Sequence, residues 1–365
     1  MYSFNPTEEQ QMLIDAVNKY AVNDLRPAAH EAEERRELPK KLLSKGWELG
    51  LLQASIPESY GGFGERSAVT GVLALEEMVF GDLAGTLAVL TPSLFATPIL
   101  LVGSEEQKQT YLPKIIEGKW SPYTAALIEH AFDFDPNELK TIATQQGDEY
   151  VIHGEKAFVP FATNAEAILV YANLDGQTQG FIIHKDAAGL TINDEREKLM
   201  SLNSLPLYRV NLENVKASTS NRLGGALGHD FEPILASMRL ANAAAALGVA
   251  NAAFEYSKNY AKEREAFGVK IAQKQAIAFM LAEMRTEIEA MRLLTWEAAW
   301  KLDQGKEDAF TEAYLGSTGS ADMAMMVTDR AVQILGGHGY IREHPVEMWM
   351  RNGRGFAMFT GLAIV

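Results

Sequence analysis

The chain contains no cysteine among its 365 residues. This absence excludes disulfide bonds, thiolate nucleophiles and every zinc site that depends on cysteine ligands. The sequence also has no Gly-x-Gly-x-x-Gly loop and no Walker-type phosphate loop, so we expect neither a Rossmann site nor a P-loop site. Any catalytic or binding role must therefore depend on other residue types.

Basic residues are scarce. Lys and Arg together number 33 against 48 Asp and Glu, which gives a net charge of −15. A nucleic-acid groove or an anionic membrane surface needs basic patches, so neither is an expected partner. An anionic ligand would have to be held by a few individually placed arginines or by backbone N–H groups.

Long apolar segments are missing as well. The longest of them, 88–102, is interrupted by Pro92 and Pro98 and is too short to cross a bilayer. Residues 1–10 are polar and acidic, unlike a signal peptide. The hydrophobic share of 47% and the charged share of 22% are typical of a globular protein, and the length predicts two or three structural units. We therefore expect a cytoplasmic protein.

Apolar residues recur at three- and four-residue spacing over two long regions, as in Leu13, Ile14 and Val17. This spacing is typical of amphipathic helices. The first helical region runs from 7 to about 118, and its segment 68–80 is a strongly apolar helix. The second follows Gly228, and its expected helices cover 240–253, 273–302 and 308–335.

Between the helical regions the period changes to two, which predicts strands. The expected strands lie at 150–153, 167–171, 180–184 and 208–212, with turns at Gly154, at 175–176 and at Asn203. The sequence therefore predicts an α+β protein in three parts, namely helices over 1–120, a β domain over 121–228 and helices over 229–365.

Four segments carry more specific information than the periodicity does. They are Ile56-Pro57-Glu-Ser-Tyr60-Gly61-Gly62, Gly154-Glu-Lys156, Arg264-Glu-Ala-Phe267-Gly268 with Gln275 eleven residues after the arginine, and Gln333-Ile-Leu-Gly336-Gly337-His-Gly339-Tyr340. Alone, each has an ordinary structural interpretation, for example a helix C-cap at Gly336 and Gly337. Together and in this order, they resemble signature stretches of the acyl-CoA dehydrogenase family, and the parallel continues between them with few gaps.

The resemblance implies the acyl-CoA dehydrogenase fold, with an N-terminal helical domain, a middle antiparallel β domain and a C-terminal helical bundle. It also implies FAD, shared at a subunit interface of a hetero- or homotetramer. In the family, residues matching Arg264, Phe267, Gln275, Gln333, Gly336 and Gly337 hold the ADP half of the FAD of a neighbouring subunit. A guanidinium suits the pyrophosphate, and glycines let backbone N–H groups approach closely.

The half of the site that would serve the chain's own flavin departs from the family. The family's Thr-Glu-Pro-x-x-Gly-Ser-Asp is replaced here by Ile128-Glu-His-Ala-Phe-Asp-Phe-Asp135. Asp133 then stands for a glycine and Phe134 for a serine. An acidic side chain repels phosphate, and each lost hydrogen bond to a charged group is worth roughly 1.5–3 kcal/mol. Weak flavin binding by the chain itself is the expected result.

The next strand continues this trend. The family's Trp-Ile-Thr, with the tryptophan against the flavin, corresponds to Phe158-Val159-Pro160, and proline has neither a hydroxyl nor an N–H to offer. Phe158 is the residue that remains in the cofactor-binding position.

No catalytic base occupies either position that the family uses. Dehydrogenation needs a carboxylate to remove the α-proton. The usual position, between an aromatic residue and glycine, holds Thr360, and the position used by a minority, before Arg239, holds Met238. Glu129 and Asp133 are the carboxylates nearest to the altered loop and are the candidate replacement bases. We therefore leave the catalytic residue open, and we expect no metal site.

Three functional hypotheses follow. The chain is the base-lacking subunit of a heteromeric acyl-CoA dehydrogenase, lending its ADP-binding residues to a partner's FAD. Alternatively, it is a self-sufficient dehydrogenase with a displaced base, or a homo-oligomer with only a structural or binding role. We favour the first, because groups for a neighbour's flavin are kept and groups for the chain's own flavin are lost.

By resemblance, the substrate is an acyl-CoA from fatty acid or steroid side-chain degradation, and electron-transfer flavoprotein is the electron acceptor. The resemblance places the acyl pocket along 68–80 and 87–100.

Overall fold

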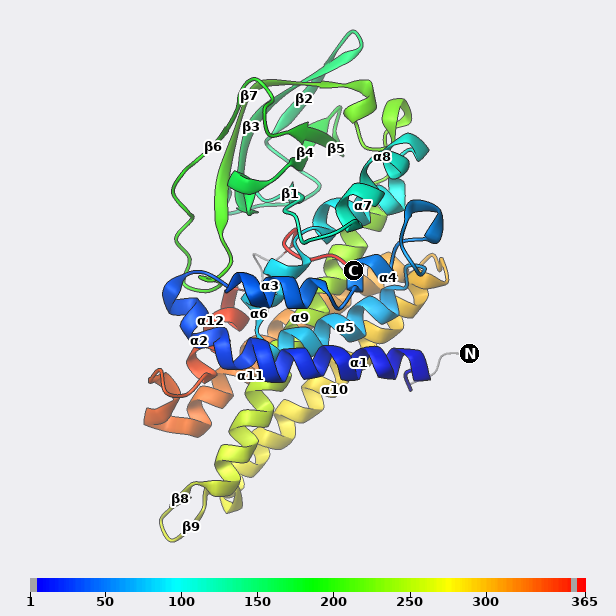
Figure 1. Ribbon diagram of the computed structural model, residues 1–365. Coiled ribbons are helices and arrows are strands. Elements are labelled where there is room, and N and C mark those ends of the chain that lie inside the picture. The colour runs from blue at the N-terminus through cyan, green and yellow to red at the C-terminus, as the bar shows by residue number, and fades with distance from the viewer. Residues whose placement is uncertain (1–4, 356–359) are drawn as a thin grey trace.

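The computed structural model describes residues 5–355 and 360–365, which form two helical regions and a β domain (Figure 1). The β domain lies at one end of the molecule, and the helices extend from it to the β8–β9 hairpin at the other end. The α+β class expected from the sequence is confirmed.

The N-terminal region is built from helices whose starts are specified by local sequence. Thr7 and Ser104 each form a capping box with the glutamine three residues later, which satisfies free N–H groups of the first turn. Pro92 separates two apolar helices that together carry the longest apolar stretch. The helices are α1 (Glu8–Tyr20), α2 (Arg26–Arg35), α3 (Lys40–Trp47), α4 (Leu51–Ala54), α5 (Ala68–Gly81), α6 (Leu83–Leu90), α7 (Ser93–Val102) and α8 (Glu105–Ile116), with a π-helical turn (Ala21–Leu25) between α1 and α2.

The β domain contains a mixed sheet rather than the purely antiparallel one expected. Strand β4 pairs antiparallel with β5 but parallel with β1, in the register Thr124 to Ile168. The order is β1-β4-β2-β3-β7-β6, with β5 attached to β4. The strands are β1 (Thr124–Ala126), β2 (Ile142–Gln146), β3 (Glu149–Pro160), β4 (Ala167–Leu174), β5 (Gln177–His184), β6 (Leu190–Ile192) and β7 (Leu207–Ser218).

The four expected strands lie within β3, β4, β5 and β7, and the turn at 175–176 connects β4 and β5 as expected. The expected turn at Gly154 is wrong, because Gly154 lies inside β3 at a register shift against β7. There a Cβ atom would come within 2.6 Å of Thr141 Oγ1, so glycine is required by close packing rather than by a chain reversal.

The C-terminal region consists of long helices that pack side by side (Figure 1). They are α9 (Glu232–Glu263), α10 (Gln275–Asp303), α11 (Ala309–Leu335) and α12 (Val346–Arg354), and the hairpin of β8 (Glu265–Ala266) and β9 (Val269–Lys270) connects α9 to α10. A 3-10 segment, Gly336–Tyr340, follows α11.

Helix α9 is the central helix of the molecule. Its middle is rich in alanine and glycine, which allows close contact with α5: a Cβ at Gly248 would come within 2.6 Å of the Glu76 carbonyl oxygen. Among the described residues, α9 is the helix long and apolar enough to cross a membrane, but 89% of its apolar window is buried in the protein. Helix α9 therefore acts as a core helix that runs from the β domain to the distal hairpin (Figure 1).

Candidate functional site

The residues predicted to bind FAD and those at the expected base positions fall into two groups at opposite ends of α9 (Figure 1). Arg264, Phe267 and Gln275 lie at the distal end, and 333–337 packs beside the last turns of α9 there. We call these residues and the segment 333–337 the distal arm. Phe158, Met238 and Thr360 belong to the other group, near the β domain, together with the loop 128–135; we call this group the proximal site.

The distal arm is shaped by a tight hairpin. Arg264 follows the last residue of α9, and Phe267 and Gly268 form the two-residue turn between β8 and β9, with φ of 55° and 79°. Such turns need positive φ at both positions, which is unusual for a bulky residue. Phe267 is 95% exposed, so packing within the chain does not explain its place at the tip.

A glycine turn forms the other side of the distal arm. Gly336 ends α11 with φ 58° and ψ −129°, a conformation essentially restricted to glycine. A Cβ added there would meet nothing within 4 Å, and one at Gly337 would meet Tyr340 Oη at 3.8 Å. The backbone is therefore accessible from outside, as an approaching ligand would require.

Two tyrosine–histidine pairs connect this glycine segment to α9. The Tyr260 hydroxyl lies 2.7 Å from His338 Nδ1, and the Tyr256 hydroxyl lies 2.7 Å from His344 Nδ1. The two imidazoles stack with centroids 5.3 Å apart. We call these four residues the Tyr–His clamp. Sequence reasoning missed it, although Tyr256 and Tyr260, four apart on one helix face, were a signal that could have been noticed.

The polar side chains of the distal arm are free to bind a ligand. Within the described part of the chain, Arg264, Gln275 and Gln333 are exposed, and no side-chain hydrogen bond or ion pair is found for them. An exposed guanidinium, free amides and an open glycine backbone are the donors that a diphosphate and an adenosine group require. The distal arm therefore fits the ADP portion of FAD.

The proximal site has a different character, because its carboxylate is already engaged. Glu129 is buried; its Oε1 accepts from Lys156 Nζ at 2.7 Å and from Thr141 N–H at 2.9 Å, and its Oε2 accepts from Lys140 N–H at 2.7 Å. Burial by itself would raise the pKa of Glu129, but Lys156 and these hydrogen bonds hold it below its usual range. Glu129 thus anchors the loop, and its geometry does not favour a role as a base.

Lys156 completes this anchor. Its ammonium group is fully buried and also donates to the Leu127 carbonyl at 3.1 Å. Burial lowers the pKa of Lys156 to about 8, against the opposing effect of Glu129. The backbone N–H of Ala157 donates to the Ile128 carbonyl at 2.8 Å, so the start of the loop is fixed directly onto β3. The sequence identified Lys156 as part of a motif but did not indicate its partner.

The remaining loop residues do not form a phosphate cradle. Asp133 is exposed and lies 3.4 Å from Lys140. A hydrogen bond to its own backbone N–H and, second, Lys140 lower the pKa of this carboxyl. Phe134 packs against the hydrophobic core. His130 Nε2 lies 2.8 Å from both Glu197 Oε1 and Arg209 Nη2. Acidic and aromatic groups therefore occupy the place where the family presents backbone donors and hydroxyls.

The positions expected to face the flavin ring and the substrate are also filled by packed side chains. Phe158 is buried with φ 54°, and its ring lies 5.1 Å from that of His130. Met238 is fully buried in a cluster with Leu127 and Ile364. Phe158 and Met238 therefore offer no side-chain group that binds a proton at neutral pH or donates a hydrogen bond to a flavin ring.

Thr360 occupies the expected base position, and the neighbouring Phe359 lies outside the described residues. Asn242 Nδ2 donates to Thr360 Oγ1 at 2.9 Å. A Cβ at Gly361 would lie 3.1 Å from Leu127 Cβ, so this segment packs directly on the start of the loop. Arg239 is turned to α11, with its guanidinium 5.0 Å from the centre of the Tyr314 ring.

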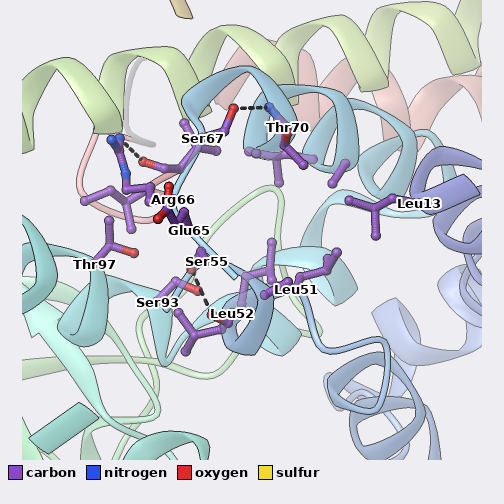
Figure 2. Close-up of a pocket in the computed structure, with 17 residues that line it drawn as sticks. Leu13, Leu51, Leu52, Ser55, Glu65, Arg66, Ser67, Thr70, Ser93 and Thr97 are labelled. Carbon is purple, nitrogen blue, oxygen red and sulfur yellow. Dashed lines mark hydrogen bonds between the residues drawn. The ribbon is translucent and has the colours of Figure 1, made fainter. Parts of the chain in front are cut away.

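A pocket between α5 and α7 lies where the resemblance places the acyl chain (Figure 2). Its walls include Ala74 and Leu75 from α5, Thr97 from α7, and Leu51 and Leu52 from α4. Among the described residues, no group of three or more His, Asp or Glu side chains is placed to hold a metal ion.

Comparison with known proteins agrees with this architecture. The chain matches the models of the acyl-CoA dehydrogenase N-terminal domain over residues 7–119, the middle domain over 125–215 and the C-terminal domain over 231–363.

Two curated relatives align along nearly their whole length. Cyclohex-1-ene-1-carbonyl-CoA dehydrogenase from Geobacter metallireducens is 34% identical, over 97% of this chain and 95% of the relative. The caffeyl-CoA reductase–Etf complex subunit CarC from Acetobacterium woodii is 33% identical, over 98% and 96%.

Two solved structures superpose on nearly the whole chain. Butyryl-CoA dehydrogenase from Megasphaera elsdenii has a TM-score of 0.88 at 31% identity, and the match covers 99% of this chain and 96% of that one. A glutaryl-CoA dehydrogenase from Mycobacterium smegmatis, solved in complex with FADH2, has a TM-score of 0.85 at 25% identity, covering 98% and 92%.

Proposed function

Because this chain belongs to the acyl-CoA dehydrogenase family, whose members are oxidoreductases acting on CH–CH donors and whose cofactor is FAD, we propose that it is the base-lacking subunit of an acyl-CoA dehydrogenase. In this role the distal arm holds the ADP portion of the FAD of a homologous subunit. The observation that carries the proposal is the contrast between an open, unpaired distal arm and a filled proximal site in one chain.

The chain's own residues would contribute binding rather than proton transfer. Bound FAD supplies the electron acceptor for α,β-dehydrogenation of an acyl-CoA. Arg264 would neutralise the diphosphate, and Gln275 and Gln333 would hydrogen-bond the adenosine. Gly336 would let the backbone approach, and the Tyr–His clamp would fix the segment 333–337 relative to α9. The α-proton would be removed by a carboxylate of the partner subunit.

The other partners of the assembly follow from the relatives. CarC is named as a subunit of an Etf complex, which supports electron-transfer flavoprotein as the electron acceptor. We propose a tetramer in which two copies of this chain meet two catalytic subunits, located in the cytoplasm and acting in fatty acid or steroid side-chain degradation. The exposed hydrophobic side chains on α10 and α11, among them Phe279, Leu293 and Leu315, support an assembly surface on these helices.

A second candidate function is a self-sufficient dehydrogenase with a displaced base. Asp133 is the observation that favours it, since this carboxylate is exposed and ionised within the loop 128–135. A base with a lowered pKa is weak, however, and the buried Phe158 and the partly buried Phe134 would still leave no place for a flavin ring.

The test is a visible absorption spectrum after saturation with FAD and gel filtration. We expect the chain expressed alone to retain little or no flavin, and its complex with a homologous catalytic subunit to retain flavin at about one FAD per catalytic subunit. Stoichiometric flavin on the chain alone would refute the base-lacking role and support the self-sufficient enzyme.

A further inference from the structure

A groove lies between α10 and α11, which run antiparallel. Glu283, near the start of α10, pairs with Arg330, near the end of α11, at 2.5 Å between Oε2 and Nη1. Further along, a Cβ at Gly319 of α11 would come within 2.6 Å of Met291 Sδ, so glycine lets this methionine lie against α11. We call this space, with a volume of about 440 Å³, the α10–α11 groove.

Apolar side chains line and flank the groove. Phe279 lies one turn before Glu283 on α10, and Leu315 lies one turn before Gly319 on α11; both side chains are more than half exposed. Exposed apolar side chains gathered around one groove are typical of a protein–protein contact. Methionine, which adapts its shape to an incoming surface, lines the groove at three positions: Met291, Met323 and Met326.

The middle of the groove is acidic. Its lining includes the carboxylates of Glu283, Glu287 and Asp322 against the guanidinium of Arg330, a net charge of −2. Glu283 is already paired with Arg330. Glu287 and Asp322 are exposed, and no hydrogen bond or ion pair is found for either within the described part of the chain. A partner that covers the groove must therefore supply positive charge, because a carboxylate that loses water without gaining a counter-charge is strongly unfavourable.

The groove is continuous with the distal arm. Gln275 starts α10 eight residues before Glu283, and the segment 333–337 begins three residues after Arg330. A subunit whose FAD reaches the distal arm must lie beside these residues, and the groove extends from them along the same two helices. We therefore expect the flavin-carrying subunit to cover the groove.

A second copy of this chain does not suit the groove. Closed homo-oligomers pair identical patches across a two-fold axis, so two copies would bring two acidic grooves together. Such a contact would contain twice the charge of one groove, and like charges across an interface act against the wrong partner. The groove thus favours a chain of different sequence.

We propose that the α10–α11 groove docks a helix of the homologous catalytic subunit. That helix places arginine or lysine side chains against Glu287 and Asp322, and apolar side chains against Phe279 and Leu315, as an amphipathic helix does in a groove. The inference rests on the proposed function and adds the chemistry of the partner, which is basic where this chain is acidic. The groove then selects a heteromer over a homo-oligomer.

The first experiment measures assembly without flavin. A homologous subunit with glutamate at the position that matches Thr360 is titrated with this chain, and the dissociation constant is measured by sedimentation velocity without FAD. We expect the double variant Glu287→Gln/Asp322→Asn to bind at least about 10-fold more weakly than the wild type at low ionic strength. The difference should shrink at high ionic strength, because salt screens the charges.

The matched control removes the same two charges elsewhere. Glu138→Gln/Asp148→Asn changes exposed residues of the β domain and should bind the catalytic subunit as the wild type does. An unchanged affinity in Glu287→Gln/Asp322→Asn, or an equal loss in the control, would overturn the proposal.

The second experiment tests the exclusion of a second copy. Each chain is sedimented alone over a range of concentrations at low ionic strength. Neutralising the groove should increase self-association of Glu287→Gln/Asp322→Asn over that of the wild type, because the repulsion between two grooves is removed. Wild-type chain that self-associates as tightly as this variant would show that the groove accepts a second copy, and would overturn the selection of a heteromer.

Failure of this inference can be distinguished from failure of the proposed function. A complex that binds FAD but has an affinity independent of Glu287 and Asp322 would refute the docking groove and leave the base-lacking role intact. A complex whose affinity depends on the groove, but whose flavin content does not depend on Arg264, would support the groove and refute the role of the distal arm.

Discussion

The two ends of α9 carry opposite kinds of residue. Near its distal end, the side chains of Arg264, Gln275 and Gln333 are exposed, and no side-chain hydrogen bond is found for them within the described part of the chain. Toward the β domain, the same helix presents Met238 and Asn242, which are buried against the loop and the Thr360 segment. A helix that had merely lost a function would show unsatisfied groups or gaps at the failed site. Here the proximal site is packed and paired, while the distal arm is open.

The difference between the two ends indicates that the departures from the family pattern at the proximal site support one another structurally. Glu129 is kept and fully engaged by Lys156, so the loop stays folded without contributing a base. Phe134 and Phe158 pack where the family places hydroxyl or flavin-facing side chains. In the proposed function, the proximal site needs no cofactor, and the distal arm binds the FAD of another subunit.

The largest expected effect tests whether the proximal carboxylate is structural. Lys156→Met leaves Glu129 buried without its cation, and breaking a buried pair by removing one partner typically costs about 3–5 kcal/mol. We expect the free energy of unfolding, measured by urea denaturation, to fall by this amount. The control is Glu149→Gln, which breaks the exposed pair with Lys216 and should cost about 0–1 kcal/mol. Equal effects of the two variants would contradict the anchor.

The next effect tests the distal arm. Arg264→Ala should weaken FAD binding in the assembled complex by about 2–5 kcal/mol, or some 30-fold or more, because a charge partner of the diphosphate is removed. Stability of the isolated chain should stay within about 0.5 kcal/mol, since the side chain is exposed. FAD content and affinity are measured by fluorescence titration. Lys262→Ala, at a nearby exposed position, is the control, and an unchanged affinity in Arg264→Ala would leave the motif with a purely structural role.

The sequence predicted some elements of the β domain correctly and missed others, and the reasons are physical. The strands within β3, β4, β5 and β7 were predicted from short apolar runs bounded by turn residues and, at 208–212, from alternation, and these signals depend only on neighbours in the chain. Strand β1 spans only three buried residues, Thr124–Ala126, so no alternation was present to reveal its parallel pairing with β4. Gly154 was misread as a turn because its glycine is required by contact with Thr141, which is distant in sequence.

Prediction of the site residues was limited in the same way, because contacts between residues far apart in the sequence were not visible. The motif residues of the distal arm were found because they are consecutive or nearly so. The pair of Glu129 with Lys156 joins residues 27 apart, and the Tyr–His clamp joins residues 78 and 88 apart, so only the folded chain reveals them. Glu129 was named as a candidate base for its proximity alone, whereas its three hydrogen bonds indicate an anchor.

A smaller effect sharpens the role of the Tyr–His clamp. His338→Phe keeps the ring stack but removes the hydrogen-bond partner of the Tyr260 hydroxyl, and a lost hydrogen bond costs about 0.5–1.5 kcal/mol. We expect faster hydrogen exchange over 336–345 and a correspondingly weaker FAD affinity in the complex. His338→Gln retains an acceptor oxygen and should recover part of the protection. If both variants exchange like the wild type, the clamp does not position the distal arm.

Acid should weaken the end of the molecule near the β domain through His229. Its Nε2 accepts from Gly180 N–H at 2.9 Å, and burial, the largest cause, lowers the pKa of His229 below its usual value of 6.5. The folded state therefore binds fewer protons than the unfolded state, so this contribution to stability is complete above about pH 6.5 and is lost as the pH falls below it. Urea denaturation between pH 7 and 5 should show this slope in the wild type and a reduced slope in His229→Gln. An unchanged slope would assign the acid sensitivity to other groups.

The smallest expected effect is an absence of activity in Thr360→Glu, and it distinguishes most directly between the base-lacking subunit and the self-sufficient dehydrogenase. Thr360→Glu places a carboxylate at the family's usual base position, and a positioned base contributes roughly 10² to 10⁴ in rate. If the chain were an active dehydrogenase that had lost only its base, this variant would restore much of that factor. We expect instead that the isolated variant shows no bleaching of flavin absorbance with any acyl-CoA, because Phe158 and Pro160 leave the proximal site without a flavin ring. The assay is anaerobic titration with a panel of acyl-CoAs after incubation with FAD, with Thr360→Gln as the uncharged control. Strong bleaching by Thr360→Glu alone would show that the packed proximal site can open to a flavin, and bleaching by the unmodified chain would point to Asp133 as its base.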